Sequence, residues 1–522
     1  MITKFITLAI GSLIALSVHG EKLGKTDCKI WSEYVDAKKY GTESLLLDFS
    51  FAGYMHGEVG IPDVKHKIFN VCDFGAIAND GKSDRAAFQK AIKAAEKNGS
   101  GIIYFPKGRF DLRAENDPNE EIKISGSNIV IRGEGSGEGG TELFMEFPNP
   151  AENPKKLYSS PCLISFDGRQ KEHKKITDII ADSKRGSFQI TVASSDGIKE
   201  GDWIRLYVRN NNPDVIAEEL KPYKVEEKWK QILTEGVMID DYHQVVKVSG
   251  NIITLKEPLM HAIDKSWEWS VRTYPMIEEI GIEDIAFVGN WKEKFKHHKN
   301  WLHDGGWKPL KINNAVNSWV RRCRFTDISE ALSVISCANV SVIDCVITGN
   351  TGHSAIRAQG SSRVFLGKIE DQPAQWHSVG FSKPSMGTVL WRVKTNANSC
   401  FESHASQPRA SLIDACEGGM MRGRAGGAVG SNPNHLNDLV FWNYKETDEG
   451  SENFDFWASD SNFWKFLPPI IVGFHGAGTT FDKSQVKYEE SNGKPVNPES
   501  LYEAQLELRL GKLPRWILDL KK

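Results

Sequence analysis

The sequence lacks an excess of charge of either sign. Its 65 lysine and arginine residues and 68 aspartate and glutamate residues leave a formal net charge of -3 over 522 residues. Because proteins that bind nucleic acid carry a basic excess, nucleic acid is not expected as a partner. The chain also lacks the CxxC, HxH, HExxH and DxDxDG spacings of familiar metal sites. No cofactor is therefore predicted, and a divalent cation is the alternative left open.

A long apolar run is missing as well. FITLAIGSLIAL, near the start of the chain, is too short to predict a membrane span. It follows one positive charge within residues 1–4 and precedes the small residues Val18 and Gly20. This pattern predicts a secretory signal peptide over residues 1–20, with a membrane anchor as the alternative. No cysteine follows the run directly, which argues against a lipid anchor. We expect a monomeric protein, secreted or periplasmic, with no membrane span after signal removal.

Cysteine occurs at eight scattered positions. Export would permit disulfides, but several cysteines lie inside apolar stretches such as VIDCVI and LIDAC. We therefore expect free thiols that pack as small hydrophobic side chains. Cys323 and Cys345 lie 22 residues apart, which predicts that they stack in one interior row.

The stretch from Val71 to Phe110 predicts a strand, a polar turn, a helix and a second strand. The turn NDGKSD supplies Ser83 or Asp84 as a helix N-cap, and apolar residues then recur at helical spacing. These apolar residues are Ala87, Phe88, Ala91, Ile92 and Ala95. The stretch resembles the N-terminal cap of the pectin-lyase-like superfamily, whose members fold as right-handed parallel β-helices. The resemblance implies an all-β solenoid sealed at this end by a helix.

Five apolar segments then recur at nearly constant steps. SWVRRCRF, VSVIDCVI, RVFLGKI, TVLWRVK and ASLIDAC begin at Ser318, Val340, Arg363, Thr388 and Ala410, so the steps are 22, 23, 25 and 22 residues. Such periods indicate the coils of a solenoid. We predict a parallel β-helix over residues 66–450, interrupted by a β-rich insertion at residues 152–274. Residues 451–522 are expected to form a C-terminal cap region, because an open solenoid end exposes strand edges.

A second strand in each repeat carries basic residues. We align the segments that start at Glu330, His353, His377 and Cys400, and side chains alternate between the two faces of each strand. The outward residues expected are His353, Arg357, His377, Phe381, Lys383, Glu402 and His404, with Arg422 and Arg424 from the next segment. Because neighbouring coils lie about 4.8 Å apart, these residues should form one basic stripe.

A basic stripe suits a polymer of uronic acids. Its cleavage by β-elimination needs a cation beside the C6 carboxylate, a base for the C5 proton and an acid for the leaving oxygen. Histidine can serve as base or acid near neutral pH. The predicted catalytic residues are His353, His377, His404 and Arg357. The predicted substrate-binding residues are Lys383, Glu402, Arg409, Arg422, Arg424, His303 and Lys308. Trp376, Phe381 and Trp391 are candidates for stacking on sugar rings.

Other interpretations stay open for several residues. A single outward histidine is commonly a solvated surface residue, and three histidines together could also bind a metal. The segment HHKNWLHDGGWKPL, which contains His303 and Lys308, is either a loop over the same groove or a solvated basic loop. Tyr242 and His243 form a polar pair or a simple strand-end turn.

The cap and coils, over most of residues 66–450, resemble exported polysaccharide lyases of marine and gut bacteria. The resemblance implies a polysaccharide lyase, with a sulfated uronic-acid polymer such as ulvan as substrate. Calcium-dependent pectate lyases of this fold carry clustered acidic residues, whereas this patch is basic, which argues against pectate. A glycoside hydrolase would need two carboxylates, for which Glu402, Asp414 and Glu417 are available. A non-catalytic carbohydrate-binding solenoid would need only the groove.

Overall fold

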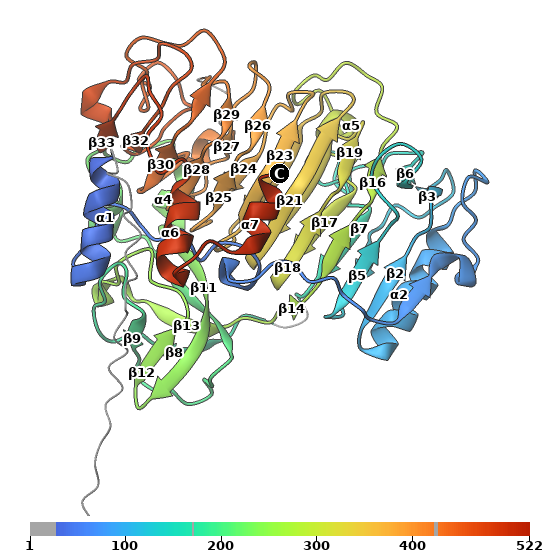
Figure 1. Ribbon diagram of the computed structural model, residues 1–522, viewed down its shortest axis with the longest axis horizontal. Helices are drawn as coiled ribbons and strands as arrows, with labels where there is room; N and C mark the ends of the chain where they lie inside the picture. The colour runs from blue at the N-terminus through green and yellow to red at the C-terminus, as the bar shows by residue number, and fades with distance from the viewer. Residues whose placement is uncertain (1–27, 170–171, 422–425) are drawn as a thin grey trace, which may run out of the picture.

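The protein folds as a parallel β-helix, as the repeats and the cap predict. The computed structural model describes residues 28–169, 172–421 and 426–522. The predicted signal peptide, Arg422 and Arg424 therefore lie outside the described residues. The coils follow one another along the long axis of the molecule (Figure 1). They run from β2 (Gly101–Tyr104) and β3 (Gly108–Arg113) at one end to β32 (Ile470–Val472) and β33 (Tyr488–Glu490) at the other. None of the helices in the described ranges has the length and apolar character that crossing a membrane requires.

Two parallel sheets form the solenoid. The larger has 20 strands: β1 (Ile68–Asn70), β2 (Gly101–Tyr104), β3 (Gly108–Arg113), β5 (Ile129–Arg132), β6 (Thr141–Met145), β14 (Ile277–Glu278), β15 (Gly281–Glu283), β16 (Ala286–Val288), β18 (Ala315–Arg321), β19 (Arg324–Thr326), β21 (Ala338–Thr348), β23 (Phe365–Asp371), β25 (Val389–Trp391), β26 (Lys394–Thr395), β28 (Ser411–Asp414), β29 (Glu417–Gly418), β30 (Leu439–Trp442), β31 (Lys445–Glu446), β32 (Ile470–Val472) and β33 (Tyr488–Glu490). The smaller has seven: β4 (Ile122–Ile124), β7 (Ile164–Asp167), β17 (Leu310–Asn313), β20 (Glu330–Ile335), β22 (Ser354–Gln359), β24 (Gly380–Ser382) and β27 (Glu402–Ser403).

The interior of the coils is a continuous apolar core. In the seven-stranded sheet, Leu332 pairs with Ile356, and Val334 pairs with Ala358, which in turn pairs with Phe381. All five side chains are buried in the same cluster. Because alternate side chains of a strand point to opposite faces, the residues between them point out of the solenoid. This alternation puts the polar stripe on the outer face.

The predicted helix at the N-terminal end is α2 (Arg85–Asn98), which packs its apolar face on the first coils. Asp84 stands at the N-cap position, but its side chain turns away from the helix. Its two carboxylate oxygens accept hydrogen bonds from the backbone N–H of Ile77, at 2.8 Å, and of Asp111, at 3.2 Å. Asp84 therefore joins the turn to the second coil instead of capping the helix.

A six-stranded antiparallel sheet interrupts the solenoid. It contains β8 (Lys175–Asp178), β9 (Gln189–Thr191), β10 (Trp203–Asn210), β11 (Val237–Ser249), β12 (Ile252–Leu255) and β13 (Ser270–Thr273), with α3 (Pro213–Glu219) and α4 (Lys230–Thr234) between strands. Two buried ion pairs join this sheet to the solenoid. Arg363 Nη1 lies 2.8 Å from Asp241 Oδ1, and Arg409 Nη2 lies 3.0 Å from Glu219 Oε1.

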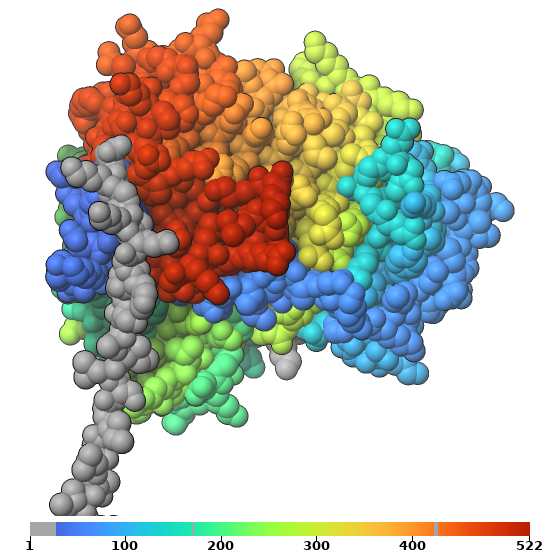
Figure 2. Space-filling model, viewed as in Figure 1, coloured from blue at the N-terminus to red at the C-terminus, as the bar shows by residue number. Residues whose placement is uncertain are grey.

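The C-terminal helices lie on the outer face of the large sheet. Helices α6 (Leu501–Leu510) and α7 (Arg515–Leu520) form a red layer over this face in Figure 2. The carboxylate of Asp414 accepts hydrogen bonds from the first backbone N–H groups of α6, Leu501 at 2.9 Å and Tyr502 at 3.0 Å. At the far end of the solenoid, Glu490 of β33 accepts hydrogen bonds from the N-terminal turn of α1 (Lys29–Tyr40). Residues near both ends of the chain thus cover the last coils.

The cysteines are free thiols, and only Cys72 is exposed. Cys323 and Cys345 lie in the interior core, and burial, followed by the neighbouring Cys345 thiol, raises the pKa of Cys323 well above its ordinary value. They therefore pack as small hydrophobic side chains.

Candidate active site

The register of the seven-stranded sheet decides which side chains meet. Arg357 pairs with Gly380, and Gly380 pairs with Glu402. The step from Arg357 to Gly380 is 23 residues, which is one less than the alignment of His353 with His377 requires. A one-residue slip reverses the faces of a strand. Phe381 was therefore predicted wrongly as an outward residue: it lies in the core, 0% exposed, with its ring centroid 5.3 Å from that of His435.

The three predicted catalytic histidines lie in one row. The ring centroids of His353 and His377 are 5.0 Å apart, and those of His377 and His404 are 4.6 Å apart. His353 comes directly before β22, His377 lies three residues before β24, and His404 follows β27. Because the three segments are neighbours in the sheet, residues spread over 52 positions of the chain meet at one place.

Glu402 holds two of these rings. Its Oε2 lies 3.1 Å from Nδ1 of His377, and its Oε1 lies 2.8 Å from Nδ1 of His404. The backbone N–H of Gly426 donates a third hydrogen bond to Oε1, at 2.8 Å. A carboxylate that accepts from Nδ1–H leaves the lone pair on Nε2, so Glu402 sets both rings with Nε2 as the free nitrogen.

The loop before β17 adds a fourth ring. The His297 ring stacks on Trp376 at 4.8 Å and lies 5.5 Å from the His353 ring and 5.3 Å from the His377 ring, between centroids. Of the two interpretations of the segment HHKNWLHDGGWKPL, the structure therefore shows the loop over the basic stripe. We call His297, His353, His377 and His404 the histidine cluster. The sequence indicated His297 only through its place in a histidine-rich loop.

Burial keeps His297, His353 and His404 of the cluster neutral. It lowers the pKa of His297 to about 3, with a further contribution from His298, and it holds the pKa of His353 well below the ordinary value, together with His377 and Arg357. Burial, followed by Arg357, also lowers the pKa of His404 to about 4. These rings therefore carry free lone pairs near neutral pH.

The histidines around Glu402 outweigh the effect of burial on its carboxyl pKa. Burial alone would raise its carboxyl pKa, but His377 and His404 hold this pKa well below the ordinary value. Glu402 thus stays ionised beneath the cluster.

Arg357 supplies the positive charge of the site. Its side chain is 9% exposed, and its Nε and Nη1 atoms have no hydrogen-bond partner among the described residues. Burial would raise the pKa of Glu330, but Lys308 and Arg357 lower it to about 2. Lys383, which directly follows β24, has an exposed side chain. Among the described residues, Arg357 and Lys383 are thus the cations of the stripe that remain open to an anion.

Three other predicted substrate-binding residues have partners within the protein. Arg409 is 2% exposed and pairs with Glu219, so it joins the two sheets and does not face a groove. His303 is fully buried and accepts a hydrogen bond at Nδ1 from the N–H of Lys296, which fixes the loop. Lys308 Nζ pairs with Glu330 Oε2 at 3.1 Å.

The residues predicted to stack on sugar rings also differ in their burial. Trp391 is buried and donates its indole N–H to Glu503 at 3.1 Å, whereas Trp376 is half-buried beside His297. Tyr242 and His243 are buried in the antiparallel sheet. Of Trp376, Phe381 and Trp391, Trp376 is the one that contacts the cluster and is not fully buried.

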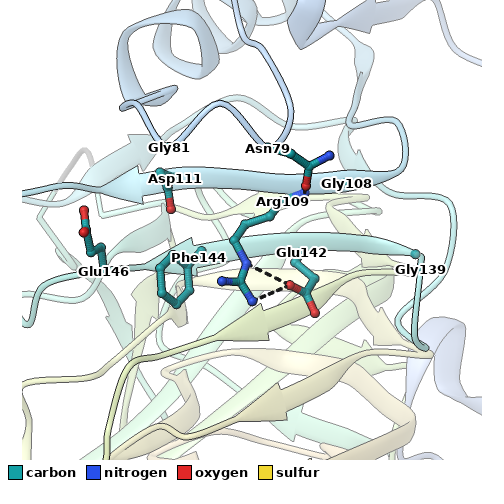
Figure 3. A pocket seen from close by; sticks show the side chains of 10 residues that line it. Asn79, Gly81, Gly108, Arg109, Asp111, Gly139, Glu142, Phe144 and Glu146 are labelled. Carbon is teal, nitrogen blue, oxygen red and sulfur yellow. Dashed lines mark hydrogen bonds and ion pairs between the residues drawn. The ribbon is translucent and has the colours of Figure 1, made fainter.

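A separate hollow of about 560 Å³ lies on the first coils, on the other sheet (Figure 3). Arg109 crosses it to Glu142, with Nη2 and Oε2 2.9 Å apart. Burial raises the pKa of Asp111, on the same hollow, to about 6, with Glu146 adding to the effect. Its lining holds three carboxylates and lacks the histidines of the basic stripe.

Comparisons with known proteins agree with the fold and the cap. Residues 68–157 match the family model "Rhamnogalacturonase A/epimerase, pectate lyase-like", and residues 374–520 match a "Domain of unknown function (DUF4955)". The first match confirms the resemblance of the cap to the pectin-lyase-like superfamily. The second covers His377, Glu402 and His404.

Curated relatives match over a short stretch. Mannuronan C5-epimerase AlgE3 of Azotobacter vinelandii is 40% identical over 70 residues, which is 13% of this chain and 4% of the epimerase. Alginate lyase 7 of the same organism is 42% identical over 71 residues, 13% of this chain and 8% of the lyase. The chain thus spans less than a tenth of these relatives.

Solved structures that align with this chain include the tailspike gp49 of Pseudomonas phage LKA1. The alignment has a TM-score of 0.44 and 12% sequence identity, and it covers 79% of this chain and 71% of the tailspike. The A-module of mannuronan C-5 epimerase AlgE6 of Azotobacter vinelandii has a TM-score of 0.36 and 12% identity, over 82% of this chain and 91% of the module.

Proposed function

We propose that the protein is an exported polysaccharide lyase that cleaves a uronic-acid polymer by β-elimination at the histidine cluster. The observation that carries the proposal is the convergence of neutral imidazoles, an ionised glutamate and an open guanidinium on one stripe of the solenoid. The curated relatives named as an alginate lyase and as mannuronan epimerases support a uronate polymer as the substrate class. The basic character of the stripe favours a strongly anionic polymer, for which sulfated ulvan is our first choice.

His404 is the base in this proposal. Its Nδ1–H donates to Glu402, so Nε2 carries a lone pair, and its side chain is 26% exposed. The buried charge of Glu402 stabilises the imidazolium that forms when Nε2 takes the C5 proton. The two electrons of the C5–H bond become the C4–C5 double bond, and the bond from C4 to the glycosidic oxygen breaks. The imidazolium then returns its proton to that leaving oxygen.

Arg357 is the group that makes the C5 proton removable. As C5 loses its proton, negative charge spreads onto the C6 carboxylate, and a buried guanidinium stabilises this charge more strongly than water does. Its fork of N–H donors fits a carboxylate in two parallel hydrogen bonds. Lys383 lies at the exposed side of the stripe and suits a neighbouring uronate or sulfate group.

A uronate C5-epimerase is the second candidate, because six of the curated relatives carry that name. Epimerisation begins with the same removal of the C5 proton but returns a proton to the opposite face of C5, and the glycosidic bond stays intact. A glycoside hydrolase fits less well. Glu402 is held by two histidines and Glu330 by Lys308, so neither carboxylate is free to flank a bond.

One set of incubations separates these functions. The protein is mixed with ulvan, alginate, pectate and glycosaminoglycans, and the ultraviolet absorbance of the unsaturated uronate is recorded together with new reducing ends. Rising absorbance on any of these polymers supports the lyase, and ulvan is expected to give the largest rise. Uptake of solvent deuterium at C5 without cleavage would mean an epimerase, and reducing ends without absorbance would mean a hydrolase. Binding without turnover would mean a carbohydrate-binding solenoid.

A further inference from the structure

Three imidazoles converge from three separate segments of the chain. His297 comes from the loop before β17, His353 from the entry to β22 and His377 from the entry to β24. One ring nitrogen of each lies within 4.8 Å of those of the other two. We propose that these three histidines bind one divalent transition-metal ion of the zinc class.

Unsatisfied nitrogen atoms support this site. His353 is 8% exposed, and neither of its ring nitrogens has a hydrogen-bond partner among the described residues. The same holds for Nε2 of His297, within the part of the chain that the structure describes. A buried polar atom without a partner costs free energy, and three such atoms at one place indicate a missing ligand.

The donor set selects the kind of ligand. Neutral imidazole nitrogens suit zinc, copper or nickel better than calcium or magnesium, which prefer oxygen. Two nitrogens bound to one tetrahedral zinc at about 2.0–2.1 Å lie about 3.3–3.4 Å apart, so the rings, whose nitrogens lie within 4.8 Å of one another, must move closer together on binding. Binding of the ion then fixes the side chains of the three histidines.

Glu402 completes this arrangement in the way that zinc sites commonly do. It accepts from Nδ1 of His377, at 3.1 Å, and so turns Nε2 of that ring outward. The Glu402 charge also acts electrostatically on His297, where it favours a cation.

A second histidine group at this place is less suitable. His298, Asp304 and His353 also have ligand atoms within reach of one another. However, Nδ1 of His298 is already paired with Asp304 Oδ2 at 2.6 Å, and the His298 side chain is 61% exposed. His353 belongs to both groups, but Nε2 of His297 is a further unpartnered buried nitrogen that the second group lacks, and for this reason we assign the ion to the group around His297.

The role of the ion rests on the proposed function, whereas its binding does not. Three protein nitrogens leave a coordination position for a water molecule or a carboxylate oxygen of the substrate. The ion would help Arg357 to neutralise the C6 carboxylate. His404 and Glu402 would remain the proton-transferring pair.

Zinc binding tests the site directly. The full-length exported protein is stripped with a chelator, and Zn²⁺ binding is then measured by competition with a chromophoric chelator. Nitrogen ligation is read from the visible spectrum of the Co²⁺-loaded protein. We expect one ion per chain, with binding at least about 100-fold weaker in His297→Ala and in His353→Ala. Glu402→Gln should weaken binding by about 10- to 100-fold, because it orients a ligand. His475→Ala is the matched control, since that histidine hydrogen-bonds the Gly473 carbonyl elsewhere, and it should bind as the wild type does.

His297→Ala also guards against a folding artefact, because His297 is a half-buried loop residue. Zinc should raise the melting temperature of the wild type and of His475→Ala, but not that of His297→Ala. The site is disproved if the wild type binds no more zinc than the His297→Ala, His353→Ala double variant. It is also disproved if His298→Ala abolishes binding while His297→Ala retains it.

Activity separates this proposal from the proposed function. Zinc bound at the three histidines in a protein that transforms none of the polymers would uphold the site and reject the lyase. Full lyase activity in stripped protein that binds no zinc would uphold the lyase and reject the site.

Discussion

Arg357 and Glu402 occupy one register position on β22 and β27, with Gly380 of β24 between them. Gly380 has no side chain, so nothing from the middle strand separates the cation from the carboxylate. The backbone there is also tight. A Cβ built on Gly380 would lie 1.8 Å from the carbonyl oxygen of Glu402, closer than atoms can approach. Glycine at this position therefore lets β24 and β27 pair and keeps the stripe open.

Gly380→Ala should consequently part the two strands. We expect a loss of at least about 1–3 kcal/mol in the free energy of unfolding, the usual cost of overpacking, and loss of activity. Urea unfolding followed by circular dichroism measures the change. Gly478→Ala is the control, because a Cβ on Gly478 meets no atom within 4 Å. Equal stability of the two variants would contradict the register described here.

The coil repeat was predictable because apolar residues must return to the interior once per turn. The face of each residue was harder to predict. Arg357 and Glu402 were placed outward correctly, but Phe381 was not, because the coils differ by single residues and each such difference reverses the faces. The repeat spacing gives the average length of a coil, and it does not give the face of each residue in an individual coil.

Polar contacts between residues far apart in the chain could not be predicted from the sequence. Arg409 looks like other arginines of the stripe in the sequence, and its partner Glu219 lies 190 residues earlier in the inserted sheet. The position of His297 against Trp376 depends on the path of a loop, which no periodicity fixes. Local patterns could therefore predict the coils and the histidine row, but not the residues that other segments bring to them.

Glu402→Gln should slow catalysis while leaving the shape of the site. The amide cannot stabilise an imidazolium on His404 as the buried carboxylate does. We expect kcat to fall by about 10²- to 10⁴-fold, the range of general acid–base catalysis, with a smaller change in KM. Initial rates on the polymer that the wild type cleaves measure both constants. The matched control is Glu417→Gln, a half-buried residue of β29 that pairs with Lys445 away from the cluster, and this variant should behave as the wild type. An unchanged kcat in Glu402→Gln would remove His404 and Glu402 from the mechanism.

Arg357→Lys tests whether Arg357 binds the substrate carboxylate through two parallel hydrogen bonds. Lysine keeps the charge but offers a single point donor in place of the planar fork. We expect kcat/KM to fall by about 10- to 100-fold, and Arg357→Ala should lower it further. Lys368→Ala, at an exposed position of β23 in the other sheet, is the control and should leave kcat/KM unchanged. If lysine supported full activity, bidentate binding of the substrate carboxylate by this residue would be wrong.

Arg409→Met should affect stability and not the chemistry. The substitution leaves Glu219 buried without its ion-pair partner, which commonly costs about 3–5 kcal/mol. The double variant Arg409→Met, Glu219→Gln should recover part of the loss, because no uncompensated charge remains. Urea unfolding of the wild type, both single variants and the double variant gives the coupling. A folded Arg409→Met protein with normal stability and a raised KM would instead restore Arg409 as a substrate-binding residue.

Acid should destabilise the protein through His435. This ring is fully buried, with Nδ1 donating to the Leu436 carbonyl at 2.7 Å and Nε2 3.0 Å from Ser411 Oγ. Burial lowers its pKa to about 3, whereas an unfolded histidine titrates near about 6.5. Between these values the unfolded chain binds the proton and the folded chain does not. The His435 contribution is therefore complete above about pH 6.5 and is lost as the pH falls toward about 3.

The expected slope is about 1.4 kcal/mol per pH unit for this one group, or about 2 kcal/mol between pH 6.5 and pH 5. Urea unfolding from about pH 7.5 to pH 5 measures it in the wild type and in His435→Asn. Because the neutral histidines of the cluster act in the same direction in both proteins, the difference between the two curves isolates His435. That difference should shrink by about 2 kcal/mol toward pH 5. Parallel curves would show that His435 takes up its proton as readily in the folded protein as in the unfolded chain, and that its burial does not set the acid limit of the fold.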